Sequence, residues 1–234
     1  MGYRIYRTQN HRKKSWFDNL SITTWLIMIN ILLFVVFSIM LSFGIDINHI
    51  ALNSNSFFEQ YTFWTLLTSM FMHGGFLHLF VNMFVLFSLG SLCERIIGKK
   101  RFLWFYLISG IIAGLLHVFL SYYFGVNLLG ARIFGDPSIP AVGASGAIFA
   151  IAGLFMILTP KLRFMLIFLP FFSLPAYIMI PLVLFVTWIV SASAGFLVGN
   201  VAHFGGFLAG VFYGLYLKNK YPRKTRMVSK YFSH

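Results

Sequence analysis

Long apolar runs separated by short polar segments dominate this chain. Residues 25–43 and 102–124 contain no charged side chain, and a helix needs about 20 apolar residues to cross the hydrocarbon core of a bilayer. Six such runs predict an all-α polytopic membrane helix bundle with six transmembrane helices, at roughly 25–43, 75–93, 102–124, 144–159, 171–190 and 196–217. Proline breaks or kinks helices, so the start of the fifth helix can shift by several residues, because Pro170, Pro175 and Pro181 interrupt that run.

The composition agrees with a membrane protein. Hydrophobic residues make up 59% of the 234 residues and charged residues 10%, whereas a soluble domain carries about 25% charged residues. The net charge of +13 does not indicate a nucleic-acid partner, because the basic residues flank the apolar runs. Cys93 is the single cysteine, so we expect no internal disulfide, no metal and no cofactor. The first run is too long for a signal-peptide core and is expected to be retained.

The distribution of Lys and Arg predicts the orientation. Seventeen of the eighteen lie before the first span, after the second, after the fourth and after the sixth. Basic loops stay in the cytoplasm, so we expect both termini there, in what is most simply a prokaryotic cell membrane. The expected divisions are a basic N-terminal segment (1–20), a membrane domain (21–217) and a basic tail (218–234).

Four polar side chains from three spans are expected to meet at one depth. Ser145 opens the fourth span, His203 lies about 12 Å below the outer end of the sixth, and His78 and Asn82 are four residues apart on one face of the second. All three spans run inward in this orientation. Polar groups at membrane depth are costly and usually functional.

These residue types suit acyl transfer. A serine hydroxyl becomes a nucleophile when a histidine accepts its proton, and the backbone N–H of Ser145 with His78 and Asn82 could donate to the oxyanion. Taken singly, each residue has a plainer interpretation. Ser145 among glycines suits helix packing, His203 suits a hydrogen-bonded interior histidine, and His78 with Asn82 suits a polar bridge between helices. Their common depth is what favours a site.

Three ordered motifs resemble those of the rhomboid family. They are His-x4-His-x3-Asn at His73, His78 and Asn82, Gly-x-Ser-Gly at 143–146, and Ala-His-x2-Gly-x3-Gly at 202–210. A Gly-x3-Glu-x3-Gly segment at 90–98 adds to the likeness, which covers about residues 57–217. The resemblance implies an intramembrane serine endopeptidase with Ser145 as nucleophile and His203 as base, without a carboxylate. It also implies supporting roles, for His73, Gly143, Gly146, Phe149 and Gly206.

The same resemblance implies that the partners are transmembrane protein substrates, cut near the outer face, and the lipid bilayer. Two positions depart from the family pattern: Thr65 follows Trp64 where the family often has arginine, and Phe149 stands where it often has tyrosine. The 46–72 loop is expected to lie in the membrane interface. Ser191 to Gly195, a run of small residues, is expected to form a mobile cap.

Two other functions fit parts of the pattern. A rhomboid-like pseudoprotease would bind transmembrane helices without cutting them, and loss of the serine or histidine would mark it, but both are present. A channel or transporter would use the polar cluster as a solute path, and internal repeats would mark it, but the sequence shows none. The natural substrate and the oligomeric state are left open by the sequence.

Overall fold

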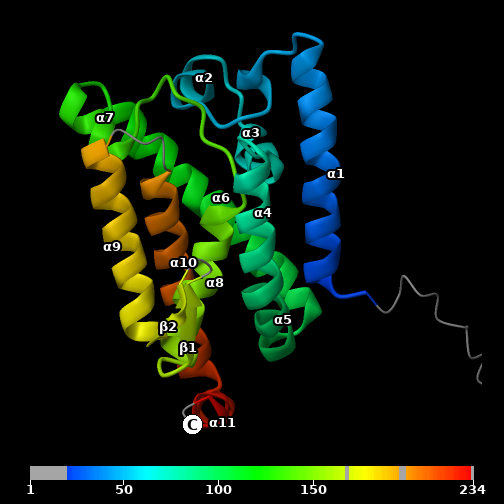
Figure 1. The fold of residues 1–234 in the computed structure, drawn as a ribbon, viewed down its shortest axis with the longest axis vertical. Helices are drawn as coiled ribbons and strands as arrows, with labels where there is room; N and C mark the ends of the chain where they lie inside the picture. Colours follow the sequence, from blue (N-terminus) through cyan, green and yellow to red (C-terminus); the bar gives the residue numbers. More distant parts are fainter. Residues whose placement is uncertain (1–19, 167–168, 195–198, 233–234) are drawn as a thin grey trace, which may run out of the picture.

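The fold is a bundle of helices, described here from a computed structural model at residues 20–166, 169–194 and 199–232 (Figure 1). The long helical segments run along the height of the molecule. They are α1 (Ile22–Ser42), α4 (Phe76–Val85) continued through the π-helical turn Leu86–Gly90 into α5 (Ser91–Ile97), α6 (Lys99–Phe124), α8 (Ser145–Leu158), α9 (Ala176–Ala194) and α10 (Asn200–Lys220).

Shorter elements close the two ends of the bundle. The α1–α4 connection holds a 3-10 turn (Ile47–His49), α2 (Ser54–Glu59), α3 (Thr65–Thr68) and a second 3-10 turn (Ser69–Phe71). α7 (Leu128–Phe134) follows α6 at the same end (Figure 1). At the other end lie the hairpin of β1 (Arg163–Leu166) and β2 (Leu169–Pro175), and α11 (Pro222–Tyr231).

The prediction of an all-α polytopic membrane bundle is confirmed. Four described segments are long and apolar enough to cross a membrane: α1, the continuous Phe76–Ile97 stretch, α6 and α9. α8 is apolar but has only 14 residues. The count of six spans stays a prediction.

Glu94 fixes the start of α1 against α5. Its carboxylate accepts hydrogen bonds from the backbone N–H groups of Ile22 (2.9 Å) and Thr23 (2.8 Å) and from the Thr23 hydroxyl (2.8 Å). A helix leaves its first N–H groups without intrahelical partners and is positive at that end. The buried Glu94 carboxylate therefore accepts hydrogen bonds from the unpaired N–H groups and places a negative charge at the positive helix end. This explains a glutamate at the end of an apolar span.

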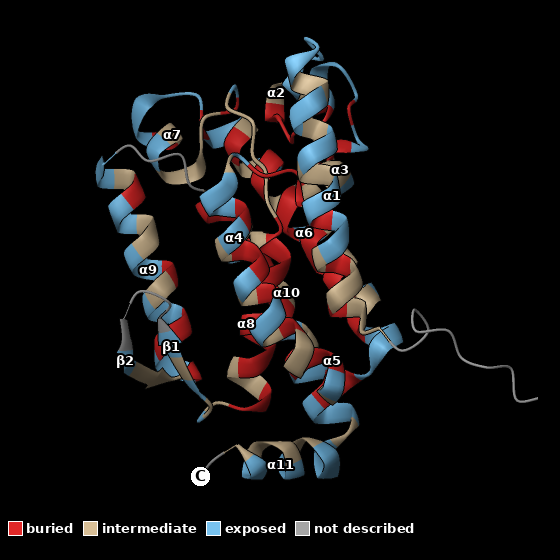
Figure 2. Cartoon of the chain, turned by 45° about the vertical axis from the view of Figure 1, so that its right-hand side comes forward, coloured by how far each residue is buried: buried red, intermediate tan, exposed pale blue. Residues whose placement is uncertain are grey.

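Glycines bring the backbones of α8 and α10 into direct contact at the centre of the bundle. A Cβ atom at Gly206 would overlap the carbonyl oxygen of Gly146, and one at Gly210 would overlap that of Ala150. Gly153 faces the backbone of Phe207 in the same way. Gly206 and Gly210 thus form a close-packing face of α10, and Figure 2 shows buried residues concentrated on α6, α8 and α10.

Two predictions about the fifth helix and the segment after it were wrong. The fifth helix begins at Ala176 and not near 171, because residues 169–175 pair with β1 as a strand between two prolines. Ser191 to Ala194 belong to α9 and form no cap, while Gly195 lies outside the described residues. Most of the basic tail is helical, since α10 continues to Lys220 and α11 follows. Nearly all of the basic segment 1–20 lies outside the described residues.

Gly206→Ala should lower the free energy of unfolding by about 1–3 kcal/mol, because overpacking a tight core forces backbone shifts. Thermal unfolding in detergent measures this. Gly199→Ala is the matched control at the start of the same helix, because the nearest atom to its added Cβ would be 3.8 Å away. Equal midpoints for the two variants would show that α8 and α10 are not held by backbone contact.

Candidate active site

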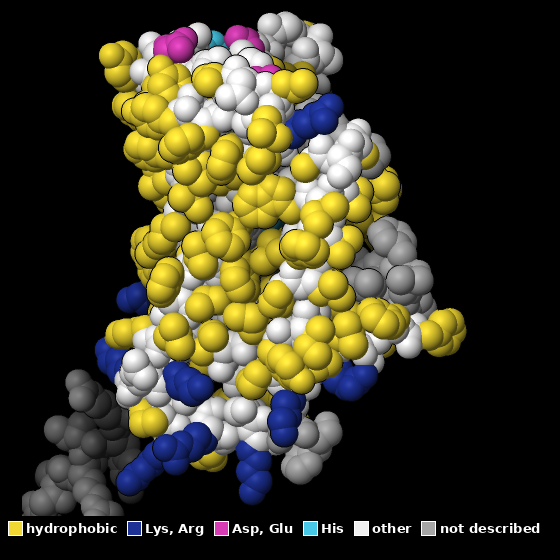
Figure 3. All heavy atoms as spheres, turned by 90° about the vertical axis from the view of Figure 1, so that its left-hand side faces the viewer, with side chains coloured by type: hydrophobic (Ala, Val, Ile, Leu, Met, Phe, Trp, Pro, Cys, Tyr) yellow, Lys and Arg dark blue, Asp and Glu magenta, His cyan; other side chains and the backbone are white. Residues whose placement is uncertain are grey.

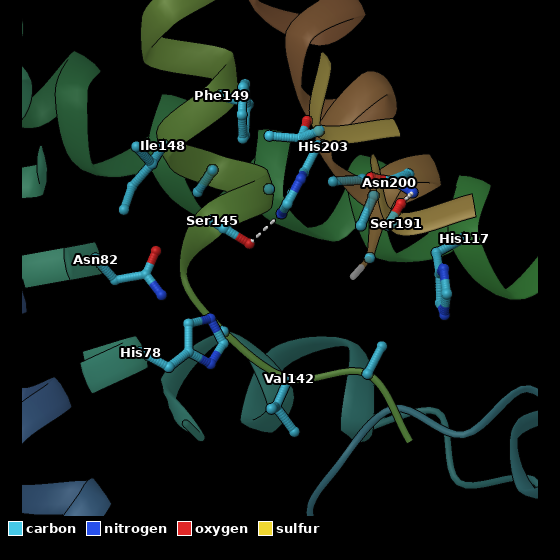
Figure 4. A pocket seen from close by; sticks show the side chains of 18 of the residues that line it. His78, Asn82, His117, Val142, Ser145, Ile148, Phe149, Ser191, Asn200 and His203 are labelled. Carbon is cyan, nitrogen blue, oxygen red and sulfur yellow. Dashed lines mark hydrogen bonds between the residues drawn. The ribbon is translucent and has the colours of Figure 1, made fainter. Parts of the chain in front are cut away.

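A large pocket lies between α4, α8, α9 and α10. It has a volume of about 1680 Å³ and is lined by all four residues of the predicted cluster: Ser145, His203, His78 and Asn82. Their side chains point toward one another across it (Figure 4). The convergence expected from topology is therefore observed.

Ser145 and His203 form a hydrogen-bonded pair. The distance from Ser145 Oγ to His203 Nε2 is 2.8 Å. Ser145 is the first residue of α8, and His203 lies in the first turn of α10, so the glycine contacts between these two helices set the distance. For the serine to donate this bond, the neutral imidazole must carry its proton on Nδ1.

The histidine has no carboxylate partner among the described residues. Its Nδ1 atom is buried and makes no hydrogen bond, and the described acidic residues are Asp46, Glu59, Glu94 and Asp136, none of which lies on α8 or α10. The phenyl ring of Phe149 stacks on the imidazole instead, with ring centroids 4.5 Å apart and planes at 28°. The ring is therefore oriented by packing on α8 rather than by a charged group.

His78 and Asn82 stand on the other side of Ser145, against Gly143. That glycine has φ +123°, and a Cβ there would lie 2.9 Å from His78 Cε1 and 3.6 Å from Asn82 Nδ2. The position therefore requires glycine both for its backbone angle and for space. The backbone turn at Gly143 thus lets the two side chains approach the start of α8.

The hydrogen bonds at these two side chains fix what they can donate. The N–H of Gly74 lies 3.4 Å from Nδ1 of His78, so the neutral ring keeps its proton on Nε2. Nδ2 of Asn82 is buried and has no partner. Two N–H donors therefore face the pocket without a hydrogen-bond partner among the described residues, beside the N–H groups at the start of α8 that have no intrahelical acceptor.

The remaining predicted residues support these groups. The imidazole of His73 is buried against that of His78, with centroids 5.2 Å apart and planes at 65°. Gly146 and Gly206 meet in the α8–α10 contact. His73 does not line the pocket, so its place is behind His78.

Two contacts at the upper end of α9 involve residues outside the predicted motifs. Asn200 Nδ2 donates to Ser191 Oγ, which joins α10 to α9. Trp188 Nε1 donates to the carbonyl oxygen of Ile133 (3.0 Å), which joins α9 to α7. An asparagine inside an apolar span was the available signal for the first. His117 also lines the pocket, but neither ring nitrogen has a partner.

Similarity to known proteins shows the family of this chain. The family model described as Rhomboid domain matches residues 60–220, which is more than half of the sequence. The chain belongs to the rhomboid family. RHOMBOID-like protein 5 of Arabidopsis thaliana is 33% identical over 156 residues, covering 66% of this chain and 44% of that protein. Rhomboid protease GluP of Bacillus subtilis is 30% identical over 193 residues, covering 77% of this chain and 33% of that protein.

A mitochondrial relative bears on localisation. The human presenilin-associated rhomboid-like protein, mitochondrial, is 32% identical over 156 residues, covering 64% of this chain and 37% of that protein. The chain thus spans less than half of the length of these curated relatives. The protein is an integral membrane protein, but rhomboid relatives from a bacterium and from mitochondria give no support to the expected prokaryotic cell membrane over an organelle.

At Thr65 and Phe149, the two positions that depart from the rhomboid pattern, the structure shows which contacts are made. Trp64 Nε1 donates to the carbonyl oxygen of His49 (2.9 Å), and the Thr65 hydroxyl donates to that of Thr62 (2.6 Å), so these bonds hold this segment of the α1–α4 connection without an arginine. Phe149 keeps the stacking on His203 but brings no hydroxyl.

Proposed function

We propose that this rhomboid protein is a serine endopeptidase that cleaves transmembrane segments of membrane proteins near their outer end, with Ser145 as nucleophile and His203 as general base. The observation that carries the proposal is the 2.8 Å hydrogen bond between Ser145 Oγ and His203 Nε2, in the wall of the pocket of about 1680 Å³. The named protease among the relatives supports hydrolysis.

The pair can carry both proton transfers of acyl transfer. Ser145 Oγ attacks the scissile carbonyl carbon while its proton moves to His203 Nε2. The imidazolium then protonates the leaving amine nitrogen, the C–N bond breaks, and the acyl group stays on Oγ as an ester. Water, deprotonated by the same nitrogen, hydrolyses the ester and frees the serine. No carboxylate is needed to balance these steps.

Three kinds of donor surround the position of the oxyanion. They are His78 Nε2–H, Asn82 Nδ2–H and the backbone N–H of Ser145 at the positive end of α8. Donors preorganised in a site of low dielectric stabilise the developing charge more in the transition state than the carbonyl in the ground state. The unused hydrogen-bonding capacity of Asn82 supports this role, because a buried donor without a partner is costly.

The dimensions of α8 support cleavage within the membrane. Its 14 residues span about 21 Å, less than the roughly 30 Å of a bilayer core, so one of its ends lies inside the hydrocarbon region. The pocket also extends between α4 and α9, where Phe84, Val85, Met179 and Val183 line it. A transmembrane segment could thus reach Ser145 from the side, while water reaches it through the open pocket.

The charge distribution supports the predicted orientation. In Figure 3, most of the visible Lys and Arg side chains gather at the lower end, below a broad hydrophobic band, whereas Asp and Glu lie at the opposite end with a cationic side chain nearby. Because basic segments face the cytoplasm, the proposed orientation has this end on the cytoplasmic side, Ser145 in the outer half of the membrane and both termini in the cytoplasm.

His78→Ala and Asn82→Ala should each lower kcat by about 10²–10³, with a much smaller change in KM, because oxyanion donors act in the transition state. Cleavage of a model transmembrane substrate in proteoliposomes measures both constants. Leu77→Ala, on the lipid-exposed side of α4, is the control and should keep kcat. Raised KM with unchanged kcat would mean that these side chains hold substrate instead.

Ser145→Ala and His203→Ala should be strongly non-additive, because losing either group already disables the proton transfer. The double variant should cleave as slowly as each single variant, and the wild-type rate should rise with pH as a histidine loses its proton. Thr187→Val removes another pocket hydroxyl, whose hydrogen bonds within the described residues go to its own helix, and should retain activity. If the rate losses of the two single variants multiplied in the double variant, Ser145 and His203 would act independently, and the proposed catalytic pair would be wrong.

A further inference from the structure

A second pocket lies at the basic end of the bundle, away from Ser145. It is an open pocket with a volume of about 580 Å³, bordered by the base of the β1–β2 hairpin, the first turn of α9 and the end of α11. Two cationic side chains, Lys161 and Arg163, and three aromatic rings, Tyr177, Tyr231 and Phe232, line it. This size falls within the range of small-molecule sites.

Arg163 is held in place with donors to spare. Its Nε donates to Ser173 Oγ (3.1 Å) and one terminal nitrogen donates to the Ser173 carbonyl oxygen (2.5 Å). A guanidinium has five N–H donors in a planar fork, so the remaining ones are available to a ligand. Ser173 pairs with Met165, two residues along β1 from the pairing of Arg163 with Pro175, so the two bonds run diagonally across the hairpin and preorganise the fork.

The positive charge of this pocket is not neutralised by the described part of the protein. Lys161 is exposed and makes no hydrogen bond or ion pair there. Glu94 is the described carboxylate at this end of the bundle, and its oxygens already accept three bonds from Ile22 and Thr23 of α1. Two neighbouring cations without a counter-charge suit a ligand with a phosphate group.

The hairpin changes from cationic to apolar along its length. Arg163 and Met165 share one face of β1, and Phe171 and Ser173 share the paired face of β2, because alternate strand residues point the same way. Arg163 lies at the base, whereas Met165 (67% exposed) and Phe171 (fully exposed) lie toward the tip. A molecule along this face would meet positive charge at one end and hydrocarbon at the other.

α11, which borders the pocket on its other side, is an amphipathic helix. Arg223, Arg226 and Lys230 follow one stripe, and the exposed Met227 and Tyr231 follow another. Figure 2 shows α11 lying across the end of the bundle rather than along it. Basic amphipathic helices that lie across the end of a membrane bundle are typical of the lipid headgroup layer. Tyrosine side chains such as Tyr177 and Tyr231 are also favoured in that layer.

We propose that this pocket binds the phosphate headgroup of an anionic phospholipid, whose acyl chains run along the exposed apolar face of the β1–β2 hairpin. Lys161 and Arg163 contact the phosphate, and the tyrosines border the glycerol region. The site is distinct from the Ser145–His203 pair, so it can be tested by binding alone, whatever the enzyme cleaves.

The test is a lipid titration of the full chain in a neutral detergent, with bound molecules counted by native mass spectrometry. Dioleoyl phosphatidylglycerol should bind at least tenfold more tightly than dioleoyl phosphatidylcholine, which has the same chains and no net charge. Lys161→Gln/Arg163→Gln should weaken phosphatidylglycerol binding by about 25-fold, because each Lys or Arg near an anionic headgroup contributes about fivefold.

The matched control is Arg95→Gln/Lys100→Gln. It removes the same two kinds of charge from exposed positions at the same end, outside the pocket lining, and should bind within about twofold of the wild type. Lys161→Gln alone should weaken binding about fivefold, and it removes no described contact, so misfolding does not confuse the result.

Three results would overturn the proposal. Equal losses in the pocket and control variants would show diffuse attraction rather than a built site. Equal affinity for the two lipids would remove the role of charge. Displacement of phosphatidylglycerol by an equal concentration of glycerol 3-phosphate would assign the pocket to a free phosphate ester, since the soluble compound lacks the chains that the hairpin face is proposed to hold.

Discussion

Backbone contact between α8 and α10 is the constraint on which the site depends. Gly146 and Gly206 remove the side chains that would otherwise hold the helices apart. In a membrane, helices gain little from hydrophobic burial against one another, and close packing of small residues takes its place. The same approach brings Ser145, at the start of one helix, within hydrogen-bonding distance of His203 in the first turn of the other. Packing and proposed chemistry therefore share the same few residues.

A second consequence concerns the missing carboxylate. In a Ser-His-Asp triad, the acid orients the imidazole and stabilises its charged form. Here the plane of Phe149 orients the ring, and a carboxylate buried within the bilayer would be costly without a partner. Glu94 shows the condition under which one is tolerated: it is buried, and three donors from α1 satisfy it. The proposed mechanism thus places its charge stabilisation on neutral N–H groups and the end of a helix.

The sequence predicted the apolar helices and the four-residue cluster because both follow from strong local signals. Uncharged runs such as 102–124 have few alternatives to a membrane helix, and the Lys and Arg pattern fixed which helix ends share a depth. The hairpin at 163–175 could not be anticipated in the same way. In a short apolar run bounded by prolines, periodicity does not distinguish a strand from a helix. The pairing of Arg163 with Pro175 depends on the three-dimensional fold and not on local sequence. The contacts of Asn200 with Ser191 and of Trp188 with Ile133 likewise depend on how α9 packs.

The central claim is that His203 activates Ser145. A fluorophosphonate reacts only with an activated serine, so labelling followed by peptide mass spectrometry tests the claim directly. The account predicts that the wild-type protein is labelled at Ser145, and that the monodisperse fraction of His203→Ala, although folded, is not. Labelling of that fraction at the wild-type rate would contradict it and would assign the base to another residue, with His117 on the pocket wall as the next to examine.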